Sequence, residues 1–236
     1  MTPEEHFIIA IDGPAGCGKS TLAKGLAREL GLTYLDTGAT YRAIALKALE
    51  NHVDPYDLEA TTKIAQYVLI DFLPDNTGES EGRVILDGSD VTDLIRTSEV
   101  SGAASVISKN PNVRHALVRV QRVIADRLFA SGARGIAVEG RDIGTVVFPD
   151  AKVKIFLTAT LDERTKRRMT DSGEDPNIYR HFQDTKAEIL ARDINDQTRE
   201  ASPLKAARDA IPIDNTAWSP EETLQHVLGI VRDAIG

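Results

Sequence analysis

The segment GPAGCGKS, from Gly13 to Ser20, constrains the fold of this chain more than any other, because of what stands on either side of it. The run FIIAI before it is continuously apolar, which is typical of a strand buried on both faces of a parallel sheet. The segment KSTLAKGLAREL after it places leucines on one face and ends at Gly31, which predicts an amphipathic helix with a glycine cap. We therefore expect a strand, a glycine-rich loop and a helix in this order.

Apolar strands and amphipathic helices alternate along most of the remaining chain. The last helix has a capping-box start at Ser219, Pro220 and Glu222, followed by an apolar stripe. This alternation predicts a doubly wound α/β fold around a parallel sheet. Further strands are predicted at residues 33–35, 135–138 and 153–157, with a weaker edge strand at 210–213, where Pro212 lacks a ladder donor.

One segment breaks this alternation. Residues 67–91, YVLIDFLPDNTGESEGRVILDGSDV, have the pattern of short strands joined by polar turns, and they lie between two helical stretches. The pattern predicts a small antiparallel insert. We expect its polar stretch DNTGESEG, residues 75–82, to form a mobile tip.

Composition narrows the class of partner. The formal net charge is -8, and this acidic balance argues against sequence-independent nucleic-acid binding, which needs a basic surface. The single cysteine, Cys17, allows no internal disulfide, which fits a reducing compartment. The first residues, MTPEEHFIIAIDG, lack the basic and long apolar regions of a signal peptide, and no run reaches the ~18 apolar residues of a membrane span. We expect a cytoplasmic protein with no membrane partner.

The glycine-rich loop carries the first chemistry. It matches the phosphate-binding pattern G-x-x-x-x-G-K-[ST] in full, so its backbone amides and the following helix start should face phosphate oxygens. Lys19 should reach the β- and γ-phosphates, and the hydroxyl of Ser20 should bind Mg²⁺. The expected ATP site comprises Asp12, Gly13, Pro14, Ala15, Gly16, Cys17, Gly18, Lys19, Ser20 and Thr21.

Loops of this kind occur in motors, GTPases, ATPases and small-molecule kinases, so other residues must discriminate. The chain has no N-K-x-D motif for reading guanine. Arginines instead gather in LDTGATYR, VEGRDIG and ARDINDQTRE, which points to an anionic acceptor. Arg141 and Asp142 lie at the end of a buried strand, just after a glycine, and strand ends in such sheets face the ligand crevice.

These segments also carry a family resemblance. The chain resembles bacterial cytidylate kinases from end to end, most specifically in LDTGATYR and EGRDIGTVVFPDA, and also in IRTSEV, NPNVRHALVRVQR and RDINDQTREASPLKAARDAIPIDNT. The resemblance implies transfer of the γ-phosphoryl group of ATP to CMP or dCMP. It also implies a single kinase unit over residues 1–236, a monophosphate-binding region at 37–132 with a β insert at about 67–95, and a short helical lid at 165–190.

The resemblance assigns residues to the acceptor. It implies that the phosphate is held by Thr37, Arg42, Arg141 and Arg199, the sugar by Arg192 and Asp196, and the base by Ser105, Arg114 and Asp142, with Tyr41 beside them. We expect Lys19, Arg141 and Arg199 to act directly in the transfer. Two positions depart from the family pattern. Ser20 stands where many members have glycine, which strengthens the expected metal ligand, and Thr40 stands where a larger apolar residue is usual.

Several alternatives stay open at this stage. The acceptor of a related P-loop kinase could be UMP, AMP or shikimate, and a binding module could hold ATP without transferring a phosphoryl group. The basic segment RTKRR at 164–168 is either a solvated helix face or the source of an arginine over the adenine or the transferred phosphate. The five histidines have no metal-ligand spacing, so zinc is not expected. We expect a monomer.

Overall fold

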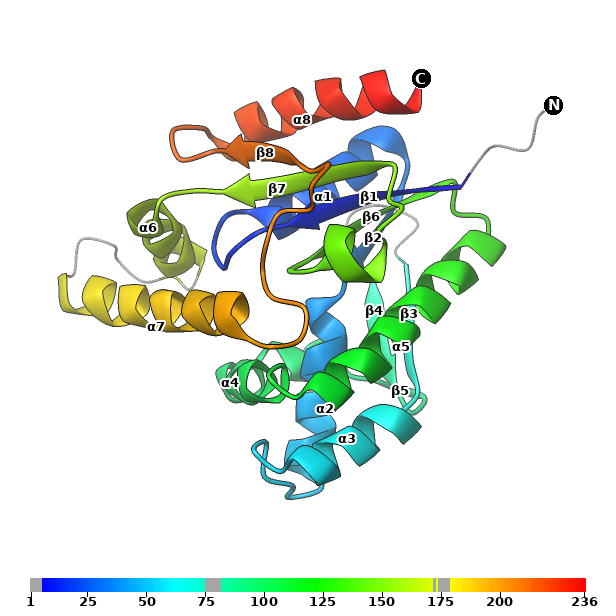
Figure 1. Ribbon diagram of the computed structural model, residues 1–236, viewed down its shortest axis with the longest axis vertical. Helices are drawn as coiled ribbons and strands as arrows, with labels where there is room; N and C mark the ends of the chain where they lie inside the picture. Colours follow the sequence, from blue (N-terminus) through cyan, green and yellow to red (C-terminus); the bar gives the residue numbers. More distant parts are fainter. Residues whose placement is uncertain (1–5, 75–81, 172, 174–178) are drawn as a thin grey trace.

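The computed structural model of the protein describes residues 6–74, 82–171, 173 and 179–236. Within these residues, five parallel strands form a sheet in the order β2-β6-β1-β7-β8 (Figure 1). The doubly wound α/β prediction is confirmed, and Pro212 lies on the edge strand as expected. The strands are β1 (Phe7–Asp12), β2 (Thr33–Asp36), β6 (Gly135–Gly140), β7 (Val153–Thr158) and β8 (Ile211–Asp214).

The sheet is buried on both faces, as its continuous apolar strands predict. Ile9 and Ile11 of β1 pack on one side with helices α1 (Lys19–Leu30) and α8 (Pro220–Ile235). Ala10, between them in the strand, packs on the other side, where α2 (Gly38–Glu50) and α5 (Pro111–Ala130) cover the sheet. The alternation follows from the two-residue period of a strand. The capping box of α8 is present, with Ser219 and Glu222 each bonded to the other's backbone.

The predicted insert forms a second, antiparallel sheet. In the described part of the chain its strands are β3 (Ile70–Leu73), β4 (Arg83–Leu86) and β5 (Ser89–Asp90). Helices α3 (Leu58–Tyr67) and α4 (Ser98–Ile107) flank this part, with a 3₁₀ turn at Leu94–Arg96. The predicted mobile tip at 75–82 lies outside the described residues, apart from Gly82.

Two helices project beyond the carboxyl ends of the strands. They are α6 (Leu161–Asp171) and α7 (Tyr179–Thr198), which lie side by side at the left of Figure 1. The segment predicted as a lid, 165–190, takes in most of α6 and the first half of α7, and part of it lies outside the described residues. A turn of π-helix at Ile143–Val147 follows β6. Over the ranges the structure describes, no helix is both long and apolar enough to cross a membrane.

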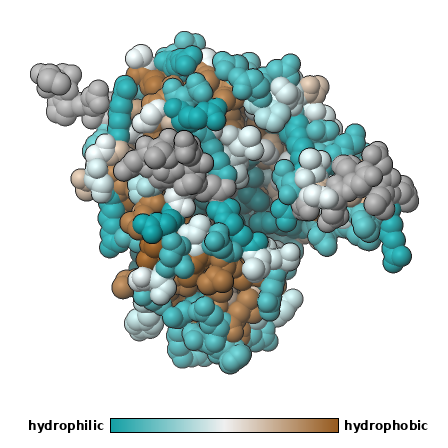
Figure 2. Space-filling model, turned by 180° about the vertical axis from the view of Figure 1, so that it is seen from behind, coloured by the Kyte–Doolittle hydropathy of each residue, from teal (hydrophilic) through white to brown (hydrophobic). Residues whose placement is uncertain are grey.

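The surface of the molecule is mainly hydrophilic. Figure 2 shows brown apolar areas in its lower half, the part that carries α2 to α5 and the small sheet. Exposed large apolar side chains in this part include Tyr67 and Leu69, where α3 runs into β3. The charged cavity described next lies on a different part of the molecule, between the strand ends and α7.

Candidate active site

A polar cavity of about 360 Å³ lies at the carboxyl ends of β2 and β6. The phosphate loop, α2, α4, α5, α6 and α7 close it from the other sides, so it joins segments from most of the chain. All the residues that the sequence predicted for the acceptor line it: Thr37, Tyr41, Arg42, Ser105, Arg114, Arg141, Asp142, Arg192, Asp196 and Arg199. From the loop, Ala15, Gly16, Lys19 and Ser20 also reach this cavity.

The loop adopts a backbone that only glycine allows at several positions. A Cβ atom on Gly13 would lie 2.1 Å from the carbonyl oxygen of Leu157, and Gly16 and Gly18 have φ angles of 75° and 90°. The amino group of Lys19 folds back and donates to the carbonyl of Pro14 at 2.7 Å. The buried thiol of Cys17 donates to the same carbonyl at 3.1 Å, which fits its expected role as a small loop residue.

The surroundings of Lys19 disfavour its positive charge. Burial, and next the positive charge of Arg141, lowers the pKa of Lys19 below its ordinary value. A lysine in this state gains from any anion placed beside it, because the anion offsets both effects. The geometry therefore suits a phosphate at Lys19.

The remaining residues of the predicted ATP site are not among those lining the cavity: Asp12, Gly13, Pro14, Cys17, Gly18 and Thr21. The carboxylate of Asp12 accepts from the amides of Ile143 and Gly144, both at 2.8 Å. It therefore ties the end of β1 to the turn after β6. Burial raises the pKa of Asp12 to about 6, although the two amides act in the opposite direction.

A cluster of arginines lines the same cavity. Asp196 accepts from Arg141 Nε and from Arg199 Nη1, each at 3.0 Å. Burial, and then the charge of Arg141, lowers the pKa of Arg192 to about 10. Among the described residues, Arg199 Nη2 and Arg42 Nε are buried without a hydrogen-bond partner. Such orphaned donors are costly unless a ligand satisfies them.

Beside the phosphate loop lie two carboxylates that were not predicted from the sequence. Asp36 ends β2 and pairs in register with Glu139 of β6, so the two side chains are neighbours. Asp36 binds Arg42 at 2.6 Å, whereas Glu139 is hydrogen bonded to Ser20 and Tyr34. Burial, and then the charge of Asp36, raises the pKa of Glu139. The signal in the sequence was a glutamate inside the apolar run GIAVEG, where a charge needs a partner.

The base side of the cavity centres on an ion pair. Arg114 Nη2 donates to Asp142 Oδ2 at 2.6 Å, and the guanidinium lies over the ring of Tyr41, 5.2 Å from its centroid. Burial acts against the charge of Arg114, but the negative charge of Asp142 and its hydrogen bond with Arg114 raise the pKa of Arg114. Ser105 lines the same region from α4.

The basic segment 164–168 is not a uniformly solvated helix face. Arg164 is buried and donates to the carbonyls of Ala159 and Ala15, at 3.0 and 3.1 Å. Arg167 donates to Asn215, and Arg168 lines the cavity. Of the two alternatives for this segment, the solvated face does not hold for Arg164, because its guanidinium binds the phosphate loop and α7.

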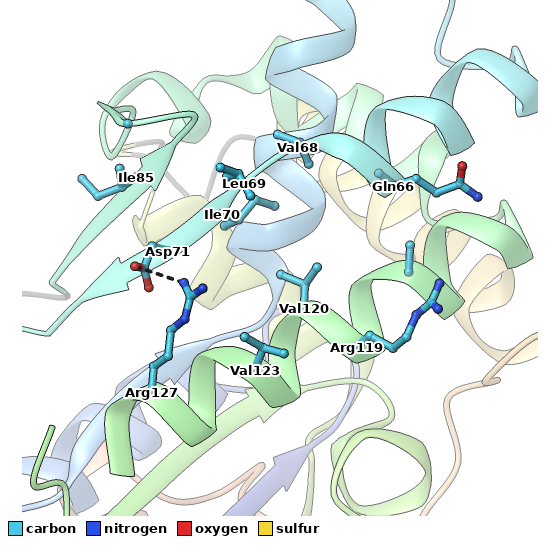
Figure 3. Close-up of a pocket in the computed structure, with 13 residues that line it drawn as sticks. Gln66, Val68, Leu69, Ile70, Asp71, Ile85, Arg119, Val120, Val123 and Arg127 are labelled. Carbon is cyan, nitrogen blue, oxygen red and sulfur yellow. Dashed lines mark hydrogen bonds and ion pairs between the residues drawn. The ribbon is translucent and has the colours of Figure 1, made fainter. Parts of the chain in front are cut away.

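A second cavity, of about 550 Å³, lies apart from this site between α3, β3, β4 and α5 (Figure 3). Val120 and Val123 of α5 face Leu69 and Ile70 across it, and Arg127 bonds Asp71 at its rim. No residue predicted for either substrate lines it. Of these two cavities, only the first is lined by residues that the sequence predicted for the substrates.

Comparisons with known proteins bear on what this cavity does. The family model described as cytidylate kinase matches residues 9–233. A cytidylate kinase from Solibacter usitatus (strain Ellin6076) is 46% identical over 236 residues, covering 99% of this chain and 96% of the relative. One from Caldicellulosiruptor bescii is 47% identical over 223 residues, 93% of each chain, and one from Bacillus thuringiensis (strain Al Hakam) is 43% identical over 231 residues, 97% of each. The resemblance inferred from the motifs is confirmed, and the chain belongs to the cytidylate kinase family.

Proposed function

We propose that the polar cavity is where this enzyme places the γ-phosphate of ATP against the phosphate of CMP or dCMP. As a cytidylate kinase, the chain transfers a phosphoryl group from ATP to these acceptors. The placement rests on the positively charged groups around this cavity. Their surroundings either disfavour the charge or leave a buried N–H donor without a partner in the described chain. Lys19 and Arg192 have lowered pKa values, and Arg42 and Arg199 each keep a buried donor without a partner in the described chain.

The chemistry needs no catalytic base in this arrangement. The acceptor atom is a phosphate oxygen, and since the second phosphate pKa is about 6 it is already largely ionised at neutral pH. The task of the protein is to bring two polyanions together and to offset their repulsion. Lys19 on the donor side and Arg141 on the acceptor side would supply the charge between them. Arg199 and Arg42 would orient the acceptor phosphate through their planar guanidinium groups.

Mg²⁺ is the divalent ion that we assign to the donor side. Ser20 offers a hydroxyl in the cavity and is hydrogen bonded to Glu139, and Asp36 is the neighbour of Glu139 in the sheet. Hydroxyl, carboxylate and water oxygens are the ligands that Mg²⁺ prefers, so these residues fit it. When bound, the ion neutralises charge on the β- and γ-phosphate oxygens. The raised pKa of Glu139 fits the same assignment, because a cation would relieve the crowding of two carboxylates.

The base would be read by the buried pair of Arg114 and Asp142. Cytosine carries an amino group where uracil carries a carbonyl oxygen, and an ionised carboxylate only accepts hydrogen bonds. Asp142 would therefore favour cytosine, while Arg114 would donate to its ring nitrogen and carbonyl. Ser105 would add a further polar contact, and Arg192 and Asp196 would lie beside the sugar.

The domain roles follow the same layout. We assign residues 37–132 to monophosphate binding, because α2, α4 and α5 carry the acceptor-side residues of that range. We assign 165–190 to a lid, because α6 and α7 border the cavity opposite the strand ends. Closure of such a lid would keep water from accepting the phosphoryl group. We also propose that the enzyme acts in the cytoplasm as a monomer.

One experiment tests the function directly. Initial rates with ATP and Mg²⁺ would be compared for CMP, dCMP, UMP, AMP and shikimate as acceptors. We expect CMP and dCMP to exceed every other acceptor in kcat/KM by at least thirtyfold, a difference of about 2 kcal/mol in transition-state binding. Equal rates with UMP or AMP would overturn the assignment of the base site, and ATP binding with no diphosphate product would indicate a binding module.

A further inference from the structure

A buried ion pair holds the phosphate loop from outside the cavity. Asp193 of α7 accepts from the amide of Ala15 at 3.3 Å through Oδ1, and its Oδ2 pairs with Nη1 of Arg164 from α6. The same Nη1 donates to the carbonyl of Ala15 at 3.1 Å. The side chains of Arg164 and Asp193 are only 9% and 7% exposed. Two helices therefore occupy both backbone polar groups of one loop residue.

The phosphate loop packs tightly against α6 at this contact. A Cβ atom on the next residue, Gly16, would lie 2.9 Å from the carbonyl oxygen of Arg164 and 3.2 Å from its Cβ. A side chain at this position would push the loop and α6 apart, because real Cβ atoms do not come within 3.0 Å of backbone atoms. The backbone of α6 therefore lies directly against the backbone of the loop. The guanidinium of Arg164 is fixed by a further hydrogen bond, because its Nε donates to the carbonyl of Ala159 at 3.0 Å. A movement of the loop at Ala15 must therefore move the ion pair.

The helix that carries Asp193 also carries acceptor-side residues. Asp196 is three residues further on, so the two carboxylates are neighbours on the surface of α7. Asp196 binds Arg141 and Arg199, the arginines assigned to the acceptor phosphate, and Arg192 lines the cavity. One turn of α7 is thus bonded on one side to the donor loop and on the other to the acceptor arginines.

We infer that Asp193, held in place by Arg164, is a positioning residue that couples the binding of ATP to the binding of the acceptor. The inference rests on the proposed placement of the two substrates. ATP fixes the loop, the loop fixes Asp193 through Ala15, and α7 then presents Asp196 and Arg192 to the acceptor in one geometry. By linkage, the acceptor tightens the binding of ATP by the same factor.

A purely structural role is the competing explanation. If the ion pair only joined α6 to α7, its loss would lower stability, because it leaves one buried charge without a partner. It would leave unchanged the ratio between the affinities for CMP without and with bound ATP. Thermodynamic coupling between the substrates is therefore the readout that separates the two roles, and stability alone does not.

The test measures the dissociation constant of CMP by calorimetry, without and with a saturating non-hydrolysable ATP analogue and Mg²⁺. In the natural enzyme we expect CMP to bind at least about fivefold more tightly when the analogue is present. In Asp193→Asn, the ratio should fall to within about twofold of one, while the affinity for CMP alone changes less than about threefold. The exposed Asp184→Asn on the same helix is the matched control and should keep the natural ratio.

A second variant covers a failure of the first to fold. Arg164→Lys keeps a positive charge beside Asp193 but loses the guanidinium that also reaches the carbonyls of Ala15 and Ala159. It should lower the coupling ratio in the same direction, and its folding is checked by circular dichroism. A natural enzyme with a ratio of one, or folded variants that keep the natural ratio, would overturn the inference. If CMP bound but the natural enzyme formed no CDP, the proposed function would fail instead, and that assay is run in parallel.

Discussion

Arg114 and Asp142 form an ion pair that is almost fully removed from solvent, with Nη2 2.6 Å from Oδ2 and side chains 3% and 7% exposed. The pair joins the first turn of α5 to the second residue after β6, so it connects α5 with the central sheet. Within the described chain, Arg114 Nε has no hydrogen-bond partner. The pair thus offers an acceptor and an unused donor at the same point, before any substrate is bound.

Replacing Asp142 with asparagine tests whether this pair reads the base. The variant keeps the shape of the side chain but presents an amide NH₂ that can face the carbonyl of uracil. We expect kcat/KM for CMP to fall at least about tenfold. We also expect the preference for CMP over UMP, which should be at least about thirtyfold in the natural enzyme, to shrink strongly. Initial rates with both acceptors give the result.

Stability is the control for this variant. The asparagine leaves Arg114 without a carboxylate, which can cost about 3 kcal/mol or more in a buried pair. The rates must therefore be measured at a temperature where circular dichroism shows a folded protein, with the exposed Asp150→Asn as the matched variant. If both acceptors slow by the same factor, Asp142 only holds Arg114 in place and does not distinguish cytosine from uracil.

Lys19→Ala should nearly abolish transfer. Lys19 lines the cavity, and one charge-stabilising contact at a transferring phosphoryl group is worth several kcal/mol of barrier. We expect kcat to fall at least about a hundredfold, equal to about 2.7 kcal/mol. The protein should stay folded, because burial already disfavours the charge that is removed. Retention of kcat within tenfold would remove Lys19 from the mechanism, and the exposed Lys152→Ala should leave kcat unchanged.

Arg141→Lys tests whether Arg141 binds the acceptor CMP and not the donor ATP. The guanidinium spans Asp196 and the carbonyl of Gly140, at 3.0 and 3.2 Å, and a lysine cannot copy this fork. We expect kcat/KM for CMP to drop at least about thirtyfold, while the affinity for ATP alone changes less than about threefold. The exposed Arg119→Lys, at the second cavity, is the control. Weakened ATP binding with normal CMP kinetics would reverse the assignment of the two substrates.

Sequence patterns predicted the elements of this fold that depend on local order. The apolar run before Gly13 predicted β1, the glycine after Leu30 predicted the end of α1, and Ser219 with Glu222 predicted the start of α8. Each of these signals lies within a few residues of the feature that it predicts. Local rules on capping, glycine and periodicity are therefore enough to find them.

The site was predictable only where a motif carried it. The arginines of LDTGATYR, VEGRDIG and ARDINDQTRE stand in short recognisable motifs, and the structure brings them into one cavity. The sequence did not predict roles for Asp36, Glu139 and Asp193, because these roles depend on partners far along the chain. Asp193 meets a loop residue 178 positions away, and no periodicity or spacing records such a contact. Register in the parallel sheet likewise decides that Asp36 stands beside Glu139.

The buried carboxylate of Asp12 gives a pH-dependent stability whose sign is opposite to that of an ordinary salt-bridged aspartate. Burial raises its pKa to about 6 from an ordinary value of 3.8. Between these values the folded protein holds the proton more tightly than the unfolded chain, so this residue's contribution to stability falls as the pH rises. From pH 4.5 to 7, the loss amounts to about 2 kcal/mol.

Asp12→Asn removes this titration while keeping one acceptor oxygen for the amides of Ile143 and Gly144. Urea unfolding of both proteins at several pH values gives the difference in their free energies of unfolding. The lost hydrogen bond shifts that difference by about 1 kcal/mol at every pH, so the slope with pH is the readout and the offset is not. We expect the natural protein to lose stability relative to the variant by about 2 kcal/mol between pH 4.5 and 7. A flat difference, or a gain by the natural protein, would show that the two amides keep Asp12 ionised in spite of its burial.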